Sequence, residues 1–397
     1  MTLRFLTSGE SHGPAITTIL DGLPAGLPLT PLIINRELIR RQKGSGAGPR
    51  MKTEHDSVHI LGGVMAGVTT GAPLSLFIKN KDHVKWRGRA IPPFSIPRPG
   101  HADLAGALKY GYRDLRPALE RASARETAIR VAVGAVCKHL LKQFEILIGG
   151  YVASIGEIEA NLDPIPFLDR LNLAEASDVR CPDQETARVM QNRIEQVISA
   201  GDTLGGVIEV IALGLPPGLG SFGQWDRKLD ARLGAALLSV PAIKGVEIGA
   251  AFANTRLHGT QAHDAIHLDH DQLVRASNRS GGLEGGVTNG QALVLRAAMK
   301  PIASTLTQQP SVDLSSGRES QTQYERSDFC PVPRAVPVLE AMVAFVLADA
   351  LLEKLGGDSM DEMLTRYSNL RRAQLSDLSI DGQAHIFWPS ETIEDHP

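Results

Sequence analysis

Two histidines in short polar loops are the residues of this sequence best suited to chemistry. His12 lies in the segment Gly9-Glu10-Ser11-His12-Gly13, and His101 lies in Arg98-Pro99-Gly100-His101-Ala102-Asp103. Glycines let a backbone approach a ligand closely, and imidazole gives or takes a proton near neutral pH. Arginines lie between and after the two loops. The grouping predicts a site that binds a phosphorylated anion and transfers a proton beside it.

Later glycine-rich segments could add backbone donors to such a site. They are residues 201–206 (GDTLGG) and 278–290 (NRSGGLEGGVTNG). Backbone N–H groups in such loops can bind a phosphate or the edge of a planar ring, although most glycine-rich loops are only turns. Lys300 and Ser304 follow the next apolar run and offer a cation and a hydroxyl for phosphate. The alternative for Lys300 is a surface lysine.

A serine hydrolase is a competing interpretation of the first loop. Residues 9–13 fit the G-x-S-x-G pattern, in which Ser11 would be the nucleophile. That pattern needs a strand, a tight turn and then a helix. Residues 15–20 (AITTIL) instead favour a strand, so the required helix is missing.

Two further patterns point to other ligands. Residues 218–223 fit G-x-G-x-x-G, with Glu247 at a suitable distance, but Pro216-Pro217 breaks the passage from strand to glycine that a dinucleotide site requires. Residues 258–271 are dense in His and Asp, and the i,i+4 spacing of His263 and His267 would suit a metal on a helix. Paired cysteines and an H-E-x-x-H motif are absent, so we predict a solvated surface and no metal there.

The overall composition favours a reduced cytoplasmic enzyme. The chain has 397 residues, 43% hydrophobic, and a formal net charge of −3, which gives no general attraction to nucleic acid or anionic membranes. Three cysteines lack metal-ligand spacing, and the first residues lack the pattern of a secretory leader. The apolar run 335–352 contains Glu340 and Asp349, so we expect a buried helix from near Pro337 to Gly356 rather than a membrane span.

Four strands and a helix are expected to position the two histidine loops. Residues 2–8 and 15–20 predict strands on either side of His12. Thr30-Pro31 predicts the start of a helix that runs to Gly44 and carries Arg40 and Arg41 to the glycine-rich loop 44–50. Later runs at 207–213 and 292–298 also predict strands.

Apolar residues from 115 to 140 recur at helical spacing and predict one long helix. Glu126 falls on its apolar stripe, where a carboxylate must be paired or bound. Arg121, Ser123 and Arg125 lie within two turns of it. An internal ion-pair cluster and a ligand site are equally compatible with this pattern.

Taken in order, these motifs resemble the chorismate synthase family. The matching segments are residues 9–13, 98–103, 121–127, 201–206, 281–290 and 326–328. The resemblance implies one large α/β domain over residues 1–397, with central helices sandwiched between antiparallel β-sheets, assembled as a homotetramer. It implies a carbon–oxygen lyase that converts 5-enolpyruvylshikimate 3-phosphate to chorismate and phosphate by trans-1,4 elimination. It also implies reduced FMN, which donates electron density that no side chain can supply.

The resemblance assigns roles residue by residue. His12 would protonate or stabilise the leaving phosphate, His101 would supply a proton at the flavin, and Asp328 would assist proton uptake at the flavin's reacting nitrogen. The implied substrate-binding residues are Arg41, Arg50, Arg98, Arg125 and Arg326. The implied flavin-binding residues are Ser123, Ala124, Asn278, Gly286, Lys300, Ser304 and Arg326.

Two points depart from this pattern or stay open. Ala47 stands where many family members have an arginine, which puts substrate affinity in question. The sequence does not say whether the chain reduces its own flavin with NADPH; the lack of a convincing dinucleotide motif favours an outside source. A non-catalytic module that binds flavin or phosphate is the remaining alternative, and the acid–base groups among the arginines argue against it.

Overall fold

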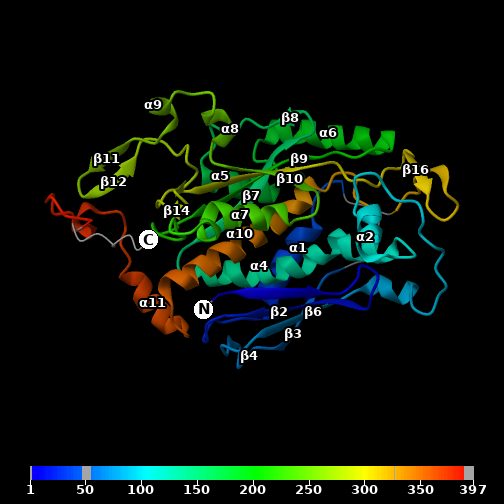
Figure 1. The fold of residues 1–397 in the computed structure, drawn as a ribbon, viewed down its shortest axis with the longest axis horizontal. Helices are drawn as coiled ribbons and strands as arrows, with labels where there is room; N and C mark the ends of the chain where they lie inside the picture. Colours follow the sequence, from blue (N-terminus) through cyan, green and yellow to red (C-terminus); the bar gives the residue numbers. More distant parts are fainter. Residues whose placement is uncertain (1, 47–54, 326, 389–397) are drawn as a thin grey trace, which may run out of the picture.

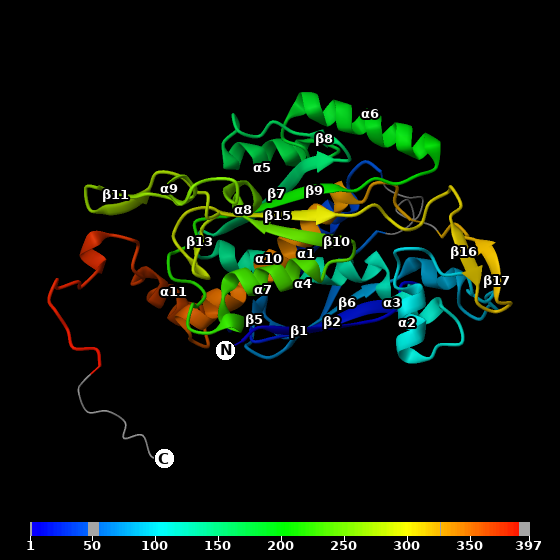
Figure 2. The same cartoon turned by 45° about the horizontal axis from the view of Figure 1, so that its top comes forward.

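Two antiparallel β-sheets enclose a layer of helices (Figures 1 and 2). The computed structural model describes residues 2–46, 55–325 and 327–388. The first sheet has the order β1-β2-β6-β3, formed by β1 (Arg4–Ser8), β2 (Ala15–Asp21), β6 (Leu74–Lys79) and β3 (Val58–Gly62). The second has the order β10-β15-β9-β7-β8, formed by β10 (Ile243–Ile248), β15 (Leu293–Met299), β9 (Gly206–Leu213), β7 (Leu147–Ile155) and β8 (Ile158–Glu159).

Four helices fill the space between the sheets: α1 (Pro31–Gln42), α4 (Thr127–Lys142), α7 (Leu229–Leu238) and α10 (Val332–Leu355). The pair α4 and α10 packs closely, since a Cβ added at Gly134 would lie 2.1 Å from the Cβ of Ala341. Figure 2 shows α5 (Phe167–Ala176) and α6 (Gln184–Ala200) on the outer face of the second sheet. One continuous cluster of buried apolar side chains includes members of both sheets and of the helices between them.

Four short hairpins and several short helices connect or extend these layers in the described residues. The hairpins are β4 (Val64–Met65) with β5 (Val68–Thr69), β11 (Ile266–Asp269) with β12 (Gln272–Arg275), β13 (Leu283–Glu284) with β14 (Val287–Thr288), and β16 (Pro310–Asp313) with β17 (Arg318–Gln321). The short helices are η2 (Lys81–Lys85), α2 (Asp103–Tyr110), α3 (Arg116–Ala122), η3 (Ala124–Glu126), η4 (Trp225–Arg227), α8 (Ala251–Asn254), α9 (Gly259–Ala262), α11 (Met360–Ser368) and η5 (Leu375–Asp377).

The predicted architecture is confirmed, as are the strands around His12 and the helix that carries Arg40 and Arg41. The prediction of one helix from 115 to 140 was wrong. The chain is extended at Ser123, with ψ 141°, and the Ser123 hydroxyl accepts a hydrogen bond from the Arg125 N–H. This break separates α3 from η3 and α4, because serine competes for backbone hydrogen bonds.

The buried apolar helix was also misplaced at its start. It begins at Val332, five residues before Pro337, which lies inside it. Pro337 is the sixth residue of α10, beyond the four N–H groups that lack a partner within a helix, so it removes one backbone hydrogen bond. Burial of most side chains of this helix offsets that loss. By length and composition α10 could cross a membrane. However, 89% of its most apolar 18-residue stretch is buried within the fold.

Candidate active site

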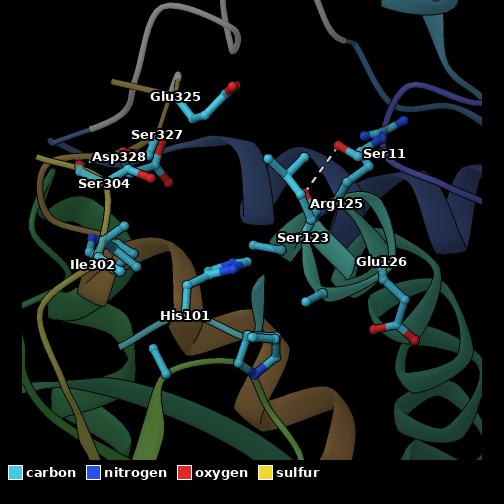
Figure 3. A pocket seen from close by; sticks show the side chains of 18 of the residues that line it. Ser11, His101, Ser123, Arg125, Glu126, Ile302, Ser304, Glu325, Ser327 and Asp328 are labelled. Carbon is cyan, nitrogen blue, oxygen red and sulfur yellow. Dashed lines mark hydrogen bonds between the residues drawn. The ribbon is translucent and has the colours of Figure 1, made fainter. Parts of the chain in front are cut away.

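A cavity of about 810 Å³ opens at one end of the sandwich. Its lining comes from the loop after β1, the segment between η2 and α2, the break between α3 and α4, the end of β15 and the start of α10. Figure 3 shows His101 between the Ser304–Asp328 side and the Ser123–Arg125 side of this cavity. The central helices α4 and α10 begin at its wall, and helix N-termini favour anions.

His12 is held by a carboxylate that sequence reasoning did not identify. The Glu120 carboxylate accepts the His12 backbone N–H at 2.7 Å through Oε2 and the ring Nδ1–H at 2.7 Å through Oε1. Gly9 makes this loop possible: its φ is +112°, and an added Cβ would lie 2.3 Å from the Ala15 carbonyl oxygen. Burial raises the pKa of Glu120, but the His12 hydrogen bonds outweigh it and leave that pKa below its ordinary value.

His101 is held in the same way by Asp103. The ring Nδ1 lies 2.6 Å from Asp103 Oδ1, and the Arg98 guanidinium donates to both carboxylate oxygens. Burial opposes the charge of Asp103, yet the bonds from His101 and Arg98 hold its pKa well below the ordinary range. Arg98 Nη1 also donates to Ser304 at 2.8 Å. Arg98 thus fixes the second histidine loop to the end of β15.

Three arginines pair with two carboxylates around the cavity. Arg125 donates to Asp56 Oδ1 at 2.5 Å and to Asn80 Oδ1 at 2.8 Å, and Arg41 lies 3.4 Å from the other Asp56 oxygen. Arg334 pairs with Asp328. Arg125 Nη2 is buried and has no hydrogen-bond partner among the described residues. A buried donor without an acceptor is costly, so this atom fits a ligand anion.

Part of the cavity wall has the chemistry to hold a flavin. Small side chains of Ser123, Ala124, Ala242 and Ala303 line it and leave room for a ring system. Lys300 lines the same wall and offers a cation; burial lowers the pKa of its ammonium. These residues fit the flavin that the sequence implied.

Most of the predicted site residues meet at this cavity. The predicted residues that line it are His12, His101, Asp328, Arg41, Arg98, Arg125, Ser123, Ala124, Lys300 and Ser304. Arg50, Arg326 and the departure Ala47 lie outside the described residues.

Two predicted flavin-binding residues do not line this cavity. The Asn278 side chain donates to the Ala292 carbonyl and accepts from the Gly282 N–H, both at 2.8 Å. A Cβ added at Gly286 would lie 2.7 Å from that of Lys228. Both residues contact other parts of the chain, within the 278–290 segment or next to it. Their role in binding the flavin stays a prediction.

Glu126 belongs to an ion pair at the cavity wall. It accepts from Arg130 Nε at 2.7 Å and from the Thr7 hydroxyl at 2.8 Å. The pairing alternative is therefore observed, while the residue also lines the cavity. Its direct contact with a ligand is not required to explain its burial.

The competing patterns have structural explanations. β2 follows Ser11 where a hydrolase would need a helix, and Ser11 accepts a hydrogen bond from Ser123 (dashed in Figure 3). A Cβ at Gly220 would lie 2.4 Å from the Gly286 carbonyl oxygen, so the chain itself fills the G-x-G-x-x-G turn. His267 lies on strand β11 rather than on a helix with His263. Among the described residues no group of three His, Cys, Asp or Glu side chains could hold a metal.

Sequence reasoning missed the residues that orient the predicted ones. They are Glu120, Asp56, Asn80, Trp86 and Arg334. Asp56 and Asn80 are distant in sequence from Arg125, so no local spacing could reveal them. Glu120 directly precedes the Arg121–Thr127 motif, and its position there was the only available signal.

A cation-rich cavity with two histidine–carboxylate pairs defines an enzyme that acts on a small anion. The chorismate synthase family model matches residues 3–352. Chorismate synthases from Trichlorobacter lovleyi and Aquifex aeolicus are each 50% identical to this chain, over 384 and 385 residues. The alignments cover 92% of this chain in both cases, and 98% and 97% of those relatives.

A solved structure has the same fold. A crystal structure of chorismate synthase superposes with a TM-score of 0.76 at 45% identity, covering 93% of this chain and 97% of that one. The chain belongs to the chorismate synthase family, whose members catalyse the last step of the shikimate pathway.

Proposed function

We propose that this protein converts 5-enolpyruvylshikimate 3-phosphate to chorismate and phosphate by trans-1,4 elimination, with reduced FMN bound in the cavity. The observation that carries the proposal is a cavity lined by Arg125 and by two histidine–carboxylate pairs, in which the buried Arg125 Nη2 has no hydrogen-bond partner among the described residues. In this reaction a C–O bond to phosphate and a ring C–H bond break. The C–H electron pair remains in the ring as a new double bond, and phosphate departs with the C–O pair.

His12 is proposed to act at the departing phosphate. Ionised Glu120 can only accept, so the proton on Nδ1 faces Glu120 and Nε2 is left to meet the ligand. A phosphate dianion beside the ring favours the imidazolium form. His12 then donates its Nε2 proton to a phosphate oxygen as the C–O bond breaks, which stabilises the leaving group.

The arginines provide the charge that holds the substrate. Arg41 and Arg125 are proposed to bind its phosphate or carboxylates, because guanidinium groups match these anions in two-donor geometry. Arg98 contributes the two N–H donors that remain after it binds Asp103 and Ser304. Arg50 and Arg326 complete the proposed set from the sequence motifs.

The remaining wall is proposed to hold the flavin and manage its protons. Reduced FMN, when bound, supplies electron density that assists departure of the phosphate. Asp103 fixes His101 at Nδ1, so Nε2 is the nitrogen available to give a proton on the flavin side. Arg334 pairs with Asp328, which is proposed to help the flavin's reacting nitrogen take up the ring proton. Ser123, Ala124, Lys300 and Ser304 bind the cofactor, with Asn278, Gly286 and Arg326 proposed from the motifs.

We also propose a cytoplasmic homotetramer that takes reduced FMN from an outside source. The family resemblance supports the tetramer and the location. The G-x-G-x-x-G turn is filled by Gly286, which supports an outside reductant rather than a built-in NADPH site.

The direct test is anaerobic turnover of the substrate with photoreduced FMN, with and without NADPH. Chorismate absorbance and free phosphate should rise equally, and only with reduced flavin. We expect His12→Ala and His101→Ala each to lower turnover by about 10²–10⁴-fold, the usual range for acid–base groups. Near wild-type rates in both variants would overturn the assigned roles. No product from folded protein with reduced flavin would favour a non-catalytic binding module.

A further inference from the structure

We propose that Glu120 is a positioning residue that orients His12 and sets a carboxylate charge against its Nδ1, so that Nε2 carries the proton delivered to the leaving group. The proposal rests on the proposed role of His12 in this reaction. Neither the family match nor the sequence motifs assign a role to Glu120.

The geometry is specific to an orienting carboxylate. Glu120 holds the backbone N–H and the ring Nδ1–H of the same residue, each at 2.7 Å, with one oxygen for each donor. A carboxylate that holds both groups fixes the loop and the ring rotation together. The side chains of both partners are nearly buried, at 13% and 11% exposure, so water screens this pair weakly.

A second contact closes one face of the ring. Trp86 packs on His12 with ring centroids 4.1 Å apart and planes at 32°. The Arg116 guanidinium also lies over the Trp86 ring, 5.5 Å from its centre. Trp86 thereby prevents the imidazole from turning away from Glu120.

The charged and titratable groups around the ring come from three elements. Glu120 and Arg116 belong to α3, His83 of η2 donates from Nδ1 to the His12 carbonyl at 2.9 Å, and Glu10 lies in the same loop as His12. Among these groups, and within the part of the chain that the structure describes, only Glu120 forms a hydrogen bond with the His12 ring. Arg116 acts on Glu120 and helps to keep that carboxylate ionised.

Trp86 supplies a direct optical readout of this pair. An imidazolium stacked on indole quenches its fluorescence, and the other two tryptophans, Trp225 and Trp388, are 74% and 88% exposed. In a W225F/W388F background, a pH titration of Trp86 emission reports when the His12 ring gains its proton. No flavin or substrate is needed. His12→Ala in this background should abolish the transition, which identifies its origin.

In Glu120→Gln the pH midpoint of this transition should fall by about one unit or more, because an opposite charge at this distance favours the protonated ring. The midpoint should stay unchanged in the control Glu157→Gln, which removes an exposed carboxylate paired with Arg193. Glu120→Asp keeps the charge and should keep the midpoint within about 0.3 unit. If Glu120→Gln does not fold, Glu120→Ala takes its place and should show the same fall in the midpoint, because it also removes the carboxylate charge. An unchanged midpoint in Glu120→Gln would overturn the proposal.

Kinetics test whether Glu120 acts through His12. We expect Glu120→Gln to lower kcat by about 10- to 100-fold, with the acid limb of the pH profile moved to lower pH. In the double variant with His12→Ala, removing Glu120 should cost almost nothing further. Independent, multiplying losses would assign Glu120 a general structural role and refute the inference. A wild-type rate in His12→Ala would instead refute the proposed function itself, so the two failures are distinguishable.

Discussion

Arg40 and Arg41 are neighbours on α1 but belong to opposite kinds of charged cluster. Arg40 lies in a network that joins the central helices, and Arg41 lies at the wall of the cavity. The network around Arg40 contains three cations and three carboxylates, and its charges cancel. The group around Arg41 contains three arginines and two carboxylates among the described residues, which leaves a surplus of positive charge.

The Arg40 network connects three helices through one buried carboxylate. Glu340 of α10 is 0% exposed and accepts from Arg40 at 2.6 Å and from Lys138 of α4 at 2.8 Å. Glu37 joins the same cations, and Glu175 pairs with Arg40 and Arg180. Burial alone would lower the pKa of Arg40, but Glu340 more than compensates and raises it. Every charge has a partner, so the network holds helices together without need of a ligand.

The Arg41 cluster behaves differently because its cations repel. Burial, with smaller contributions from Arg334 and Arg125, lowers the pKa of Arg41 to about 10 against the opposing effect of Asp56. The unpartnered Arg125 Nη2 lies in this cluster. Functional sites often retain such unfavourable charge, since a bound anion relieves it. The comparison therefore predicts that one cluster determines stability and the other ligand binding.

The largest expected effect is on folding. Arg40→Met removes the main partner of buried Glu340 and should lower the free energy of unfolding by about 3–5 kcal/mol. Urea denaturation followed by circular dichroism measures this change. A loss below about 1 kcal/mol would show that Lys138 alone satisfies Glu340.

The same network should be sensitive to acid. Arg40 and Lys138 overcome the effect of burial and lower the pKa of Glu340 from 4.5 to about 2. A lowered carboxylate pKa means that its stabilisation is complete above pH 4.5 and is lost as pH falls toward 2, an effect of roughly 3 kcal/mol. Glu340→Gln should have a flatter stability profile over this window. Parallel profiles for the two proteins would contradict the assignment.

Substitution of Arg41 should affect binding more than folding. Arg41→Met removes one cation from the cluster, and we expect kcat/KM to fall by about 100-fold, as for loss of a charge-assisted hydrogen bond. The free energy of unfolding should change by less than about 1 kcal/mol, because relief of repulsion offsets the lost bonds to Thr127 and the Ala124 carbonyl. A large stability loss with unchanged kcat/KM would reverse the comparison.

The smallest expected effect is stabilisation by inorganic phosphate, which distinguishes the Arg41 cluster from the Arg40 network without substrate. Inorganic phosphate at ten times its Kd should stabilise the wild-type protein by about 1.4 kcal/mol, since it binds only the folded state. The increase should shrink in Arg41→Met and persist in Glu340→Gln. Thermal denaturation at fixed ionic strength, with chloride as the control anion, measures the difference. Equal shifts with chloride would indicate general salt effects.

Local sequence patterns predicted the strands on both sides of His12 and the α1 helix because alternation, capping and proline placement act within a few residues. They failed at Ser123, where a hydroxyl bond to the Arg125 N–H breaks a helix that apolar spacing favoured. They also failed at the start of α10, where Pro337 gave a false boundary. Helical periodicity indicates which face of a helix is buried. It does not indicate where a side chain takes over a hydrogen bond of the backbone and so ends the helix.

The candidate site divides in the same way. Histidine and arginine in glycine-flanked motifs identified the residues that meet the ligand, because their chemistry is visible in their type. Their partners Glu120, Asp56 and Arg334 were not identified, since an ordinary carboxylate or arginine acquires its role only from what it contacts.

The sequence by itself determined the proton-transfer groups, the cationic character of the site, the main strands and the resemblance to one family. Only the tertiary structure decided which charges cancel and which remain available. Arg40 and Arg41 have the same side chain and adjacent positions, but a helix turns about 100° between neighbours, so they face different surroundings. Charge balance at a buried site is a property of packed neighbours distant in sequence, and it is fixed when the helices and sheets come together.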